Sequence, residues 1–227
     1  MLKINDANNF RRTALGLCLI VGPLVTLIGG LVAPWEENDT MVAWLRVLAE
    51  NPLRAQIGAV CFSVGYLLIA VSIFGILNLL RQRAVVLGHL AGIFAIWGWL
   101  TLPGLLVVDF YDLALAQSLD LEQAVTVAER TQEYALAPLI GFSVPLGILA
   151  LALLVVALWR AGFVPVWVPV AFFVGTAVSF FGPPGLVFFT IGPATWLVTL
   201  GYVGLKVLRL SDKEWERGPA TDPLSTA

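Results

Sequence analysis

Ionisable residues are scarce in this chain of 227 residues. Only 12% of the residues are charged, whereas soluble domains carry about 25%, and 59% are hydrophobic. A single histidine, His89, excludes the simplest bis-histidine haem site and any multi-histidine zinc site. Cys18 and Cys61 both fall within long apolar stretches, which argues against a disulfide framework or a cysteine metal pair. The sequence therefore predicts an integral membrane protein, and we expect no cofactor.

Long windows without charge are the main feature of the chain. A helix needs about 20 apolar residues to cross about 30 Å of hydrocarbon. The last window is too long for one crossing and is interrupted by FGPPG at 181–185, where glycine and proline favour a tight turn. We therefore expect an all-α bundle, a single polytopic transmembrane domain over 1–210, followed at 211–227 by a short, polar, disordered cytoplasmic tail. The six spans are predicted at 14–34, 56–80, 85–108, 134–159, 164–181 and 185–207.

The distribution of charge predicts the orientation. If the N-terminus is inside, the inner segments hold ten of the thirteen lysines and arginines, and the outer loops hold ten of the fifteen acidic residues. Basic residues near the ends of spans are retained on the cytoplasmic side. We expect a multi-pass protein of a bacterial inner membrane with both termini in the cytoplasm. Its expected partners are the lipid bilayer and either other membrane proteins or a second copy, and no basic surface indicates nucleic acid.

One short pattern occurs three times, each copy consisting of an aromatic, a small hydroxyl and a β-branched residue. The copies are FSVGY from Phe62, FSVPL from Phe142 and FTIGP from Phe189. Each lies in the outer part of a span that runs inward. A second match, TLIGGLVAPW against TLPGLLVVDF, joins the first and third spans. We interpret these matches as three successive helical hairpins, each leaving through an odd-numbered span and returning through an even-numbered one.

A residue that weakens the helix follows each of these triplets. Pro145 and Pro193 lack a backbone N–H and so free a carbonyl in the preceding turn, and Gly65 weakens the first copy. The hydroxyl residues are therefore candidates for a small polar site beside exposed carbonyls. These candidates are Ser63, Ser143 and Thr190. The alternative, which we favour, is that each hydroxyl bonds a carbonyl of its own helix and helps the helices to pack closely.

The first two outer connections are long and patterned. They cover 36–54 and 109–133 and mix apolar and charged residues at helix-like intervals, whereas the third is only FGPPG. In the second, apolar residues follow the i, i+3, i+4, i+7 spacing of an amphipathic helix, at Leu121, Ala124, Val125 and Ala128. We expect short amphipathic helices in both loops. They would either close over a central site or rest on the membrane surface, and we favour the second.

Asp109 and Asp112, in VVDFYD, are the strongest individual candidates for a site. An acid at the centre of a transmembrane helix costs about 2.5–3.5 kcal/mol, and less near the boundary. Their i, i+3 spacing puts both carboxylates on one face if the helix continues past Asp109. They could cap the next helix, pair with an outer arginine as a clasp, or hold a cation or proton. We favour the cap, and the clasp over the cation site. The clasp partners available in the outer loops are Arg46, Arg54 and Arg130.

Two resemblances are visible. PWEE at 34–37 resembles the P-x-E-E motif of small membrane lycopene cyclases over these four residues, but NDT follows it where those motifs lead into an apolar helix. Over the whole chain, six spans, basic inner ends and D-F after the third span resemble uncharacterised bacterial inner-membrane proteins with a domain of unknown function. That resemblance implies a six-helix membrane fold and brings no activity with it.

Two functional classes follow from these observations. Small-residue packing motifs and the lack of clustered polar residues in the spans favour a non-enzymatic membrane interaction or assembly protein. The repeat, the prolines within the spans and Asp109 favour a small permease or channel for a small solute or cation, with a site near the outer ends of the helices. A membrane enzyme acting on a lipid-like substrate has the weakest support, because no nucleophile–base pair or metal set is visible.

Overall fold

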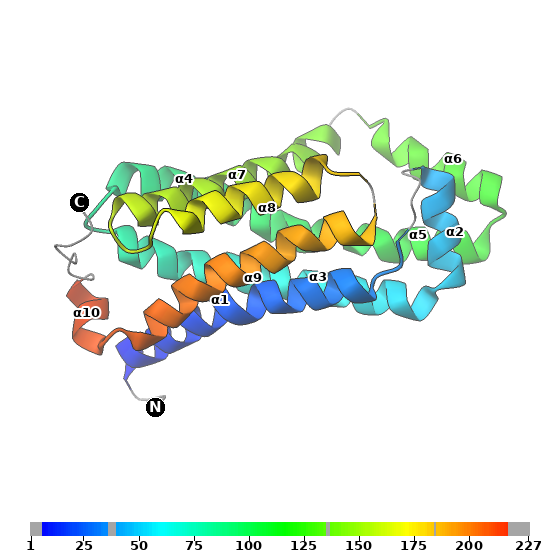
Figure 1. Ribbon diagram of the computed structural model, residues 1–227. Coiled ribbons are helices and arrows are strands. Elements are labelled where there is room, and N and C mark those ends of the chain that lie inside the picture. Colours follow the sequence, from blue (N-terminus) through cyan, green and yellow to red (C-terminus); the bar gives the residue numbers. More distant parts are fainter. Residues whose placement is uncertain (1–5, 36–39, 135–136, 184, 218–227) are drawn as a thin grey trace.

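The computed structural model describes residues 6–35, 40–134, 137–183 and 185–217, and this part of the chain contains helices and no strands (Figure 1). Six longer helices form the body. They are α1 (Ala7–Val32), α3 (Pro52–Leu80), α4 (Val85–Leu105), α7 (Ala137–Arg160), α8 (Trp167–Phe181) and α9 (Leu186–Arg209). Four short helices lie at the two ends. They are α2 (Met41–Glu50), α5 (Val107–Ser118), α6 (Leu121–Gln132) and α10 (Asp212–Arg217).

Five segments are long and apolar enough to cross a membrane. They are α1, α3, the continuous stretch of α4 and α5, α7 from Ile140, and α9. α8 is also apolar but has only 15 residues, so at 1.5 Å per residue it extends about 22 Å, less than the roughly 30 Å of a hydrocarbon core. The structure thus has five to six candidate spans, which agrees with the prediction of an all-helical, multi-pass membrane protein.

The long helices pack against one another in chain order. α1 contacts α3, α3 contacts α4, α4 contacts α7, α7 contacts α8, α8 contacts α9, and α9 returns to α1. Figure 1 shows α7 and α8 along one side of the bundle and α1 and α9 along the other. The ring encloses a core in which Trp99 and Phe172 are among the largest fully buried side chains. The contact between α1 and α9 therefore closes the bundle.

Glycines set the closest approaches between these helices. A Cβ added at Gly147 of α7 would lie only 2.6 Å from the Cα of Gly98 on α4. A Cβ added at Gly204 of α9 would lie 2.7 Å from the carbonyl oxygen of Gly16 on α1. Small residues allow such approaches, and tight van der Waals packing is a main source of helix association in membranes. Even a methyl group at either position would force the helices apart.

The three short helices α2, α5 and α6 pack together at one end of the bundle, and we call them the outer cap after the orientation predicted from the sequence (Figure 1). Thr40 caps α2 by accepting the Ala43 N–H at 3.2 Å, and Asp120 caps α6 by accepting the Gln123 N–H at 3.0 Å. Leu45 of α2 is buried with Ala124 and Ala128 of α6. Part of the apolar face predicted for this segment, Ala124 and Ala128, thus contacts α2.

The prediction of a disordered tail is wrong for residues 212–217, which form α10. The Glu214 carboxylate accepts the Ser211 N–H and hydroxyl at 2.7 Å each, and the Glu214 N–H donates to the Ser211 hydroxyl at 3.2 Å. This is a capping box, for which S-x-x-E is the sequence signal. Trp215 is only 4% exposed and packs into the main core. The rest of the predicted tail, 218–227, lies outside the described residues.

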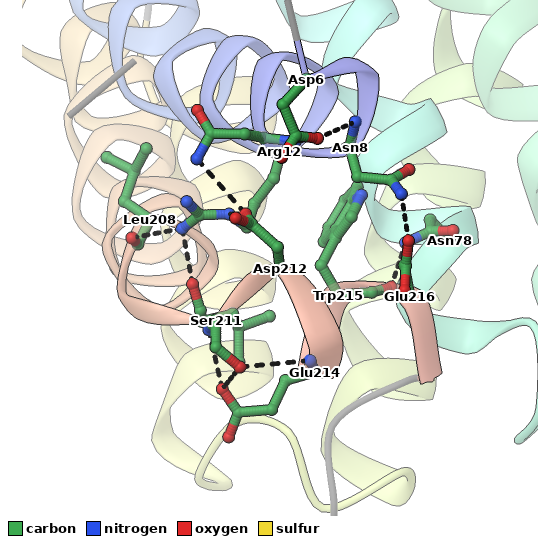
Figure 2. A network of polar contacts seen from close by, with 12 residues as sticks. Asp6, Asn8, Arg12, Asn78, Leu208, Ser211, Asp212, Glu214, Trp215 and Glu216 are labelled. Atoms are coloured by element: carbon green, nitrogen blue, oxygen red, sulfur yellow. Dashed lines mark hydrogen bonds and ion pairs between the residues drawn. The ribbon is translucent and has the colours of Figure 1, made fainter. Parts of the chain in front are cut away.

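A polar network, called the inner clasp here, ties α10 to the start of α1 (Figure 2). Arg12 forms an ion pair with Asp212 at 3.1 Å and donates to the carbonyl oxygens of Leu208 at 2.8 Å and Leu210 at 2.6 Å. Asn9 donates to Asp212 at 3.3 Å. Because the last carbonyls of a helix have no partner within the helix, Arg12 satisfies groups that would otherwise need water. One side chain near the N-terminus thus holds the C-terminal end of α9 and the start of α10.

Candidate functional site: an aromatic cavity beneath the outer cap

A cavity of about 280 Å³ lies where one end of each of α1, α3, α4 and α9 meets α2 and α5 of the outer cap. We call it the outer cavity. Most of its lining is aliphatic or aromatic, and Asp109 is the one carboxylate among the described residues that line it, with no lysine, arginine or histidine beside it. Its aromatic walls are Trp35, Trp44, Phe62, Tyr66 and Phe189. The site is therefore an apolar chamber with one carboxylate.

The aromatic side chains hold one another in place. The Trp35 and Phe189 ring centroids are 4.0 Å apart, and Phe189 contacts Phe62 edge-on at 5.8 Å. Phe62 stacks on Tyr66, also at 5.8 Å. The Trp35 indole N–H donates to the Gly30 carbonyl at 2.8 Å, which orients the ring. Rings fixed by neighbours in this way lose little further freedom when a ligand binds.

The boundary between α4 and α5 positions Asp109. Pro103 lies in the last turn of α4, which ends at Leu105. After Leu106 alone, α5 begins at Val107, so Asp109 falls in the first turn of α5, where a carboxylate is favourable. Asp109 is half-buried and close enough to Tyr66 to interact with it electrostatically. The break in the helix thus aims a carboxylate at the outer cavity.

Asp112 has a different environment from Asp109. It is buried and accepts the Trp44 indole N–H at 3.0 Å, which connects α5 to α2. The two carboxylates lie on the same helix and interact electrostatically. Asp109 lines the cavity, however, and Asp112 holds a wall of the cavity in place. Trp44 is a site residue that the sequence analysis missed, and its only signal was a tryptophan within a predicted amphipathic loop helix.

No arginine clasp joins these acids within the described residues, where the ion pair present is that between Arg12 and Asp212. Arg54 donates instead to the carbonyl of Val32 at 3.0 Å. Arg46 and Arg130 are exposed on the outer cap. The structure therefore leaves the Asp109 carboxylate facing the cavity without an arginine counter-ion.

The three hydroxyl candidates do not line the outer cavity. The Ser143 hydroxyl donates to the Ile140 carbonyl at 2.6 Å, and the Thr190 hydroxyl lies within hydrogen-bond distance of the Leu186 and Val187 carbonyls. These are the local bonds of the favoured alternative. Ser63 is half-buried and is also absent from the cavity wall. The aromatic residues of the triplets differ as well, because Phe62 is 6% exposed and Phe142 is 65% exposed.

An aromatic column closes the cavity toward the middle of the bundle. Tyr66 contacts Trp99 edge-on at 5.5 Å, and Trp99 contacts Trp196 at 5.3 Å. Trp99 is fully buried, and its indole N–H has no hydrogen-bond partner. Such a group is costly to bury unpaired. The column therefore blocks the path from the outer cavity into the bundle, and it contains one buried polar group without a partner, the Trp99 indole N–H.

The other residues that the sequence singles out form no metal site within the described part of the chain. Over the described residues no group of three or more histidine, cysteine, aspartate or glutamate side chains lies where it could hold a metal ion. His89 is exposed, with its Nδ1 2.7 Å from the Val85 carbonyl oxygen. The glutamates of the PWEE motif, at 36 and 37, lie outside the described residues. The chain matches no protein-family model, no curated protein and no solved structure.

Proposed function

We propose that this chain is a multi-pass membrane protein that binds a small organic cation in the outer cavity. The observation that carries the proposal is the half-buried Asp109 carboxylate, without an arginine partner, in a chamber walled by five aromatic side chains. A carboxylate favours a positive ligand, and the faces of aromatic rings attract cations with about 0.5–2 kcal/mol each. An anion or a strongly hydrated ligand would lose its water without compensation.

Size and polarity narrow the ligand class. The cavity, at about 280 Å³, is slightly smaller than the roughly 300–1,000 Å³ that is usual for ligand sites. Its walls offer much apolar surface and few hydrogen-bonding groups. The best match is a compact amine or quaternary ammonium ion with an apolar body, since its charge meets Asp109 while its carbon skeleton fills the chamber.

We further propose that the end of the bundle opposite the outer cap faces the cytoplasm. At the end of the bundle opposite the outer cap, Arg83 donates to the Ala161 carbonyl at 2.9 Å and Lys206 to the Phe163 carbonyl at 2.7 Å. With the positive-inside bias, these positions support a cytoplasmic basic end, cytoplasmic termini and an outer cavity on the far side of an inner membrane. Direct packing of α1 on α3, α4 on α7 and α8 on α9 is compatible with three related hairpins.

A protein that only binds the cation and one that transports it differ in whether the aromatic column must move. A permease would have to move Trp99 and Trp196 to continue the path inward, whereas a binding protein could keep them packed. Flux of radiolabelled phenethylammonium into proteoliposomes separates the two. Uptake above that of protein-free vesicles indicates a permease, and binding without uptake indicates a receptor-like role.

Binding itself is tested by calorimetry on the purified full chain with phenethylammonium and its neutral analogue, phenethyl alcohol. We expect Asp109→Asn to weaken binding of the cation by at least about tenfold, equivalent to 1.4 kcal/mol, and to leave the alcohol unaffected. Asp112→Asn is the matched control, because an amide oxygen at 112 can still accept from Trp44. Equal affinities for the amine and the alcohol, or an unchanged Asp109→Asn variant, would reject the proposed ligand class.

Assembly is a second candidate function, supported by the face of α7 and α8. An apolar groove of about 400 Å³ lies between these helices, and the side chain of Phe181 at its edge is 90% exposed. A short span can relieve its mismatch with the bilayer by oligomerising, which favours a second copy of this chain as the occupant. Single-molecule photobleaching in nanodiscs measures the copy number. Single-step bleaching throughout would reject this second function.

A further inference from the structure

A second cavity, of about 380 Å³, lies at the basic end of the bundle, where α1, α3 and α10 meet. We call it the inner cavity. Its lining combines two arginines, one glutamate, two asparagines and three apolar side chains. These residues are Arg11, Arg81, Glu216, Asn8, Asn78, Leu15, Phe74 and Trp215. It lies at the opposite end from the outer cavity and shares none of its lining, so it has no part in the cation binding proposed above.

The lining residues lie in register along two helix faces. On α1 the positions 8, 11 and 15 follow an i, i+3, i+7 pattern, and on α3 the positions 74, 78 and 81 follow i, i+4, i+7. Such spacings place side chains in one row along a helix. In both rows the polar residues are at the end of the helix and the apolar residue, Leu15 or Phe74, lies deeper. Together the two rows line a cavity that is polar at the end of the bundle and apolar toward the middle of the bundle.

The two arginines differ in how many of their N–H groups already donate to the protein. Arg81 is half-buried and is held by bonds to the Asn78 side-chain oxygen at 2.9 Å and the Trp215 carbonyl at 3.3 Å. A guanidinium has five N–H donors, so donors remain for a ligand. Arg11 is exposed at the cavity, whereas its neighbour Arg12 is occupied by the inner clasp. Arg11 and Arg81 therefore present positive charge to the inner cavity from two helices.

Glu216 supplies the opposite charge. The Asn8 side-chain amide donates to one of its carboxylate oxygens, which holds it over the cavity (Figure 2). A pocket for a simple anion would gain nothing from this carboxylate. A headgroup with both a phosphate and an ammonium matches all three charges, because its phosphate can meet the arginines while its ammonium meets Glu216.

We propose that the inner cavity binds an aminophospholipid from the leaflet at the basic end, with the phosphate at Arg11 and Arg81, the ammonium at Glu216 and an acyl chain along Leu15 and Phe74. Both arginines lie at the ends of the apolar parts of their helices, so the membrane placement proposed above, on which this inference rests, would bring them to the depth of headgroup phosphates. The side chain of Phe74, 55% exposed, offers the acyl chain of the lipid an apolar surface on the outside of the bundle.

The test uses native mass spectrometry of the full chain in detergent, titrated with phosphatidylethanolamine, phosphatidylglycerol of the same acyl chains, and O-phosphoethanolamine, which has the headgroup without chains. We expect phosphatidylethanolamine to bind tightest. Arg11→Gln should weaken it by at least about tenfold, as expected for loss of a charge-assisted contact. Arg209→Gln is the control, because Arg209 has the same charge at the same end, is exposed and does not line the cavity.

Glu216→Gln separates the headgroup from general attraction of phosphate. We expect it to abolish the preference for phosphatidylethanolamine over phosphatidylglycerol while both lipids still bind. Equal weakening by Arg11→Gln and Arg209→Gln would overturn the proposal in favour of a diffuse basic surface. Binding of O-phosphoethanolamine as tight as that of the lipid would show a site for a soluble phosphate, and a wild-type preference for phosphatidylglycerol would overturn the role of Glu216.

Discussion

Replacing Gly147 with alanine tests a close approach between two helices of the bundle, α4 and α7. The added Cβ would lie 2.6 Å from the Gly98 Cα, whereas carbon atoms prefer about 3.5–4.0 Å. The α4 and α7 helices would therefore have to separate by about 1 Å at this point. Gly141 provides the matched control on the same helix, because a Cβ there would have no neighbouring atom within 4 Å.

The magnitude follows from two opposing effects. Alanine is favoured over glycine within a helix by about 0.5–1 kcal/mol, and this gain applies to both variants. Overpacking a tight contact costs about 1–3 kcal/mol, and this applies only at Gly147. We expect Gly141→Ala to be neutral or slightly more stable than the wild type and Gly147→Ala to be less stable than Gly141→Ala by about 1–3 kcal/mol.

Reversible unfolding of the purified protein, followed by tryptophan fluorescence, measures both variants. At about 2–4 °C per kcal/mol for a chain of this size, the difference between their Tm values should be several degrees. A Gly147→Ala variant as stable as Gly141→Ala would refute the close approach of α4 to α7. A loss in both variants would show that alanine perturbs α7 itself and that the contact with α4 is not the cause.

Three further predictions concern the two ends of the bundle. Arg12→Ala should lower the free energy of unfolding by about 1–3 kcal/mol, because it removes the ion-pair partner of Asp212 and the donor to two carbonyls, and faster hydrogen exchange in α10 would locate the loss. Hydrogen bonds from the capping box lower the pKa of Glu214, so its contribution to α10 is present above the unfolded value of 4.5 and is lost as the pH falls through the lower folded value. A fluorine-labelled tryptophan in α10 should report this change, and Glu214→Gln should remove it. In a cysteine-free background of intact cells, an impermeant thiol reagent should modify a cysteine at position 120 and not at 82, and the reverse would refute the orientation.

Part of the site could be read from the sequence. Asp109 stands out because it follows a long uncharged stretch, and the structure places it at the outer cavity. The sequence did not show which aromatic residues would line the cavity, since Phe62 and Phe142 have nearly the same local sequence and opposite burial. In a membrane, lipid is as apolar as a protein core, so hydrophobicity does not show which face of a helix points inward. The carboxylate could be found because its burial is costly wherever it lies.

The sequence by itself determined the features that depend on neighbouring residues: the apolar helices, the break at FGPPG, and the caps at Thr40 and Asp120. Each follows from the length of an apolar run or from bonds within a few positions along the chain. Only the tertiary structure decided that α9 closes the ring against α1, that α2 covers α6, and that α10 packs against α1. These outcomes rest on contacts such as Arg12 with Asp212 and Trp44 with Asp112. Their partners are far apart in sequence, and local preference carries no information about which of many similar apolar surfaces will meet.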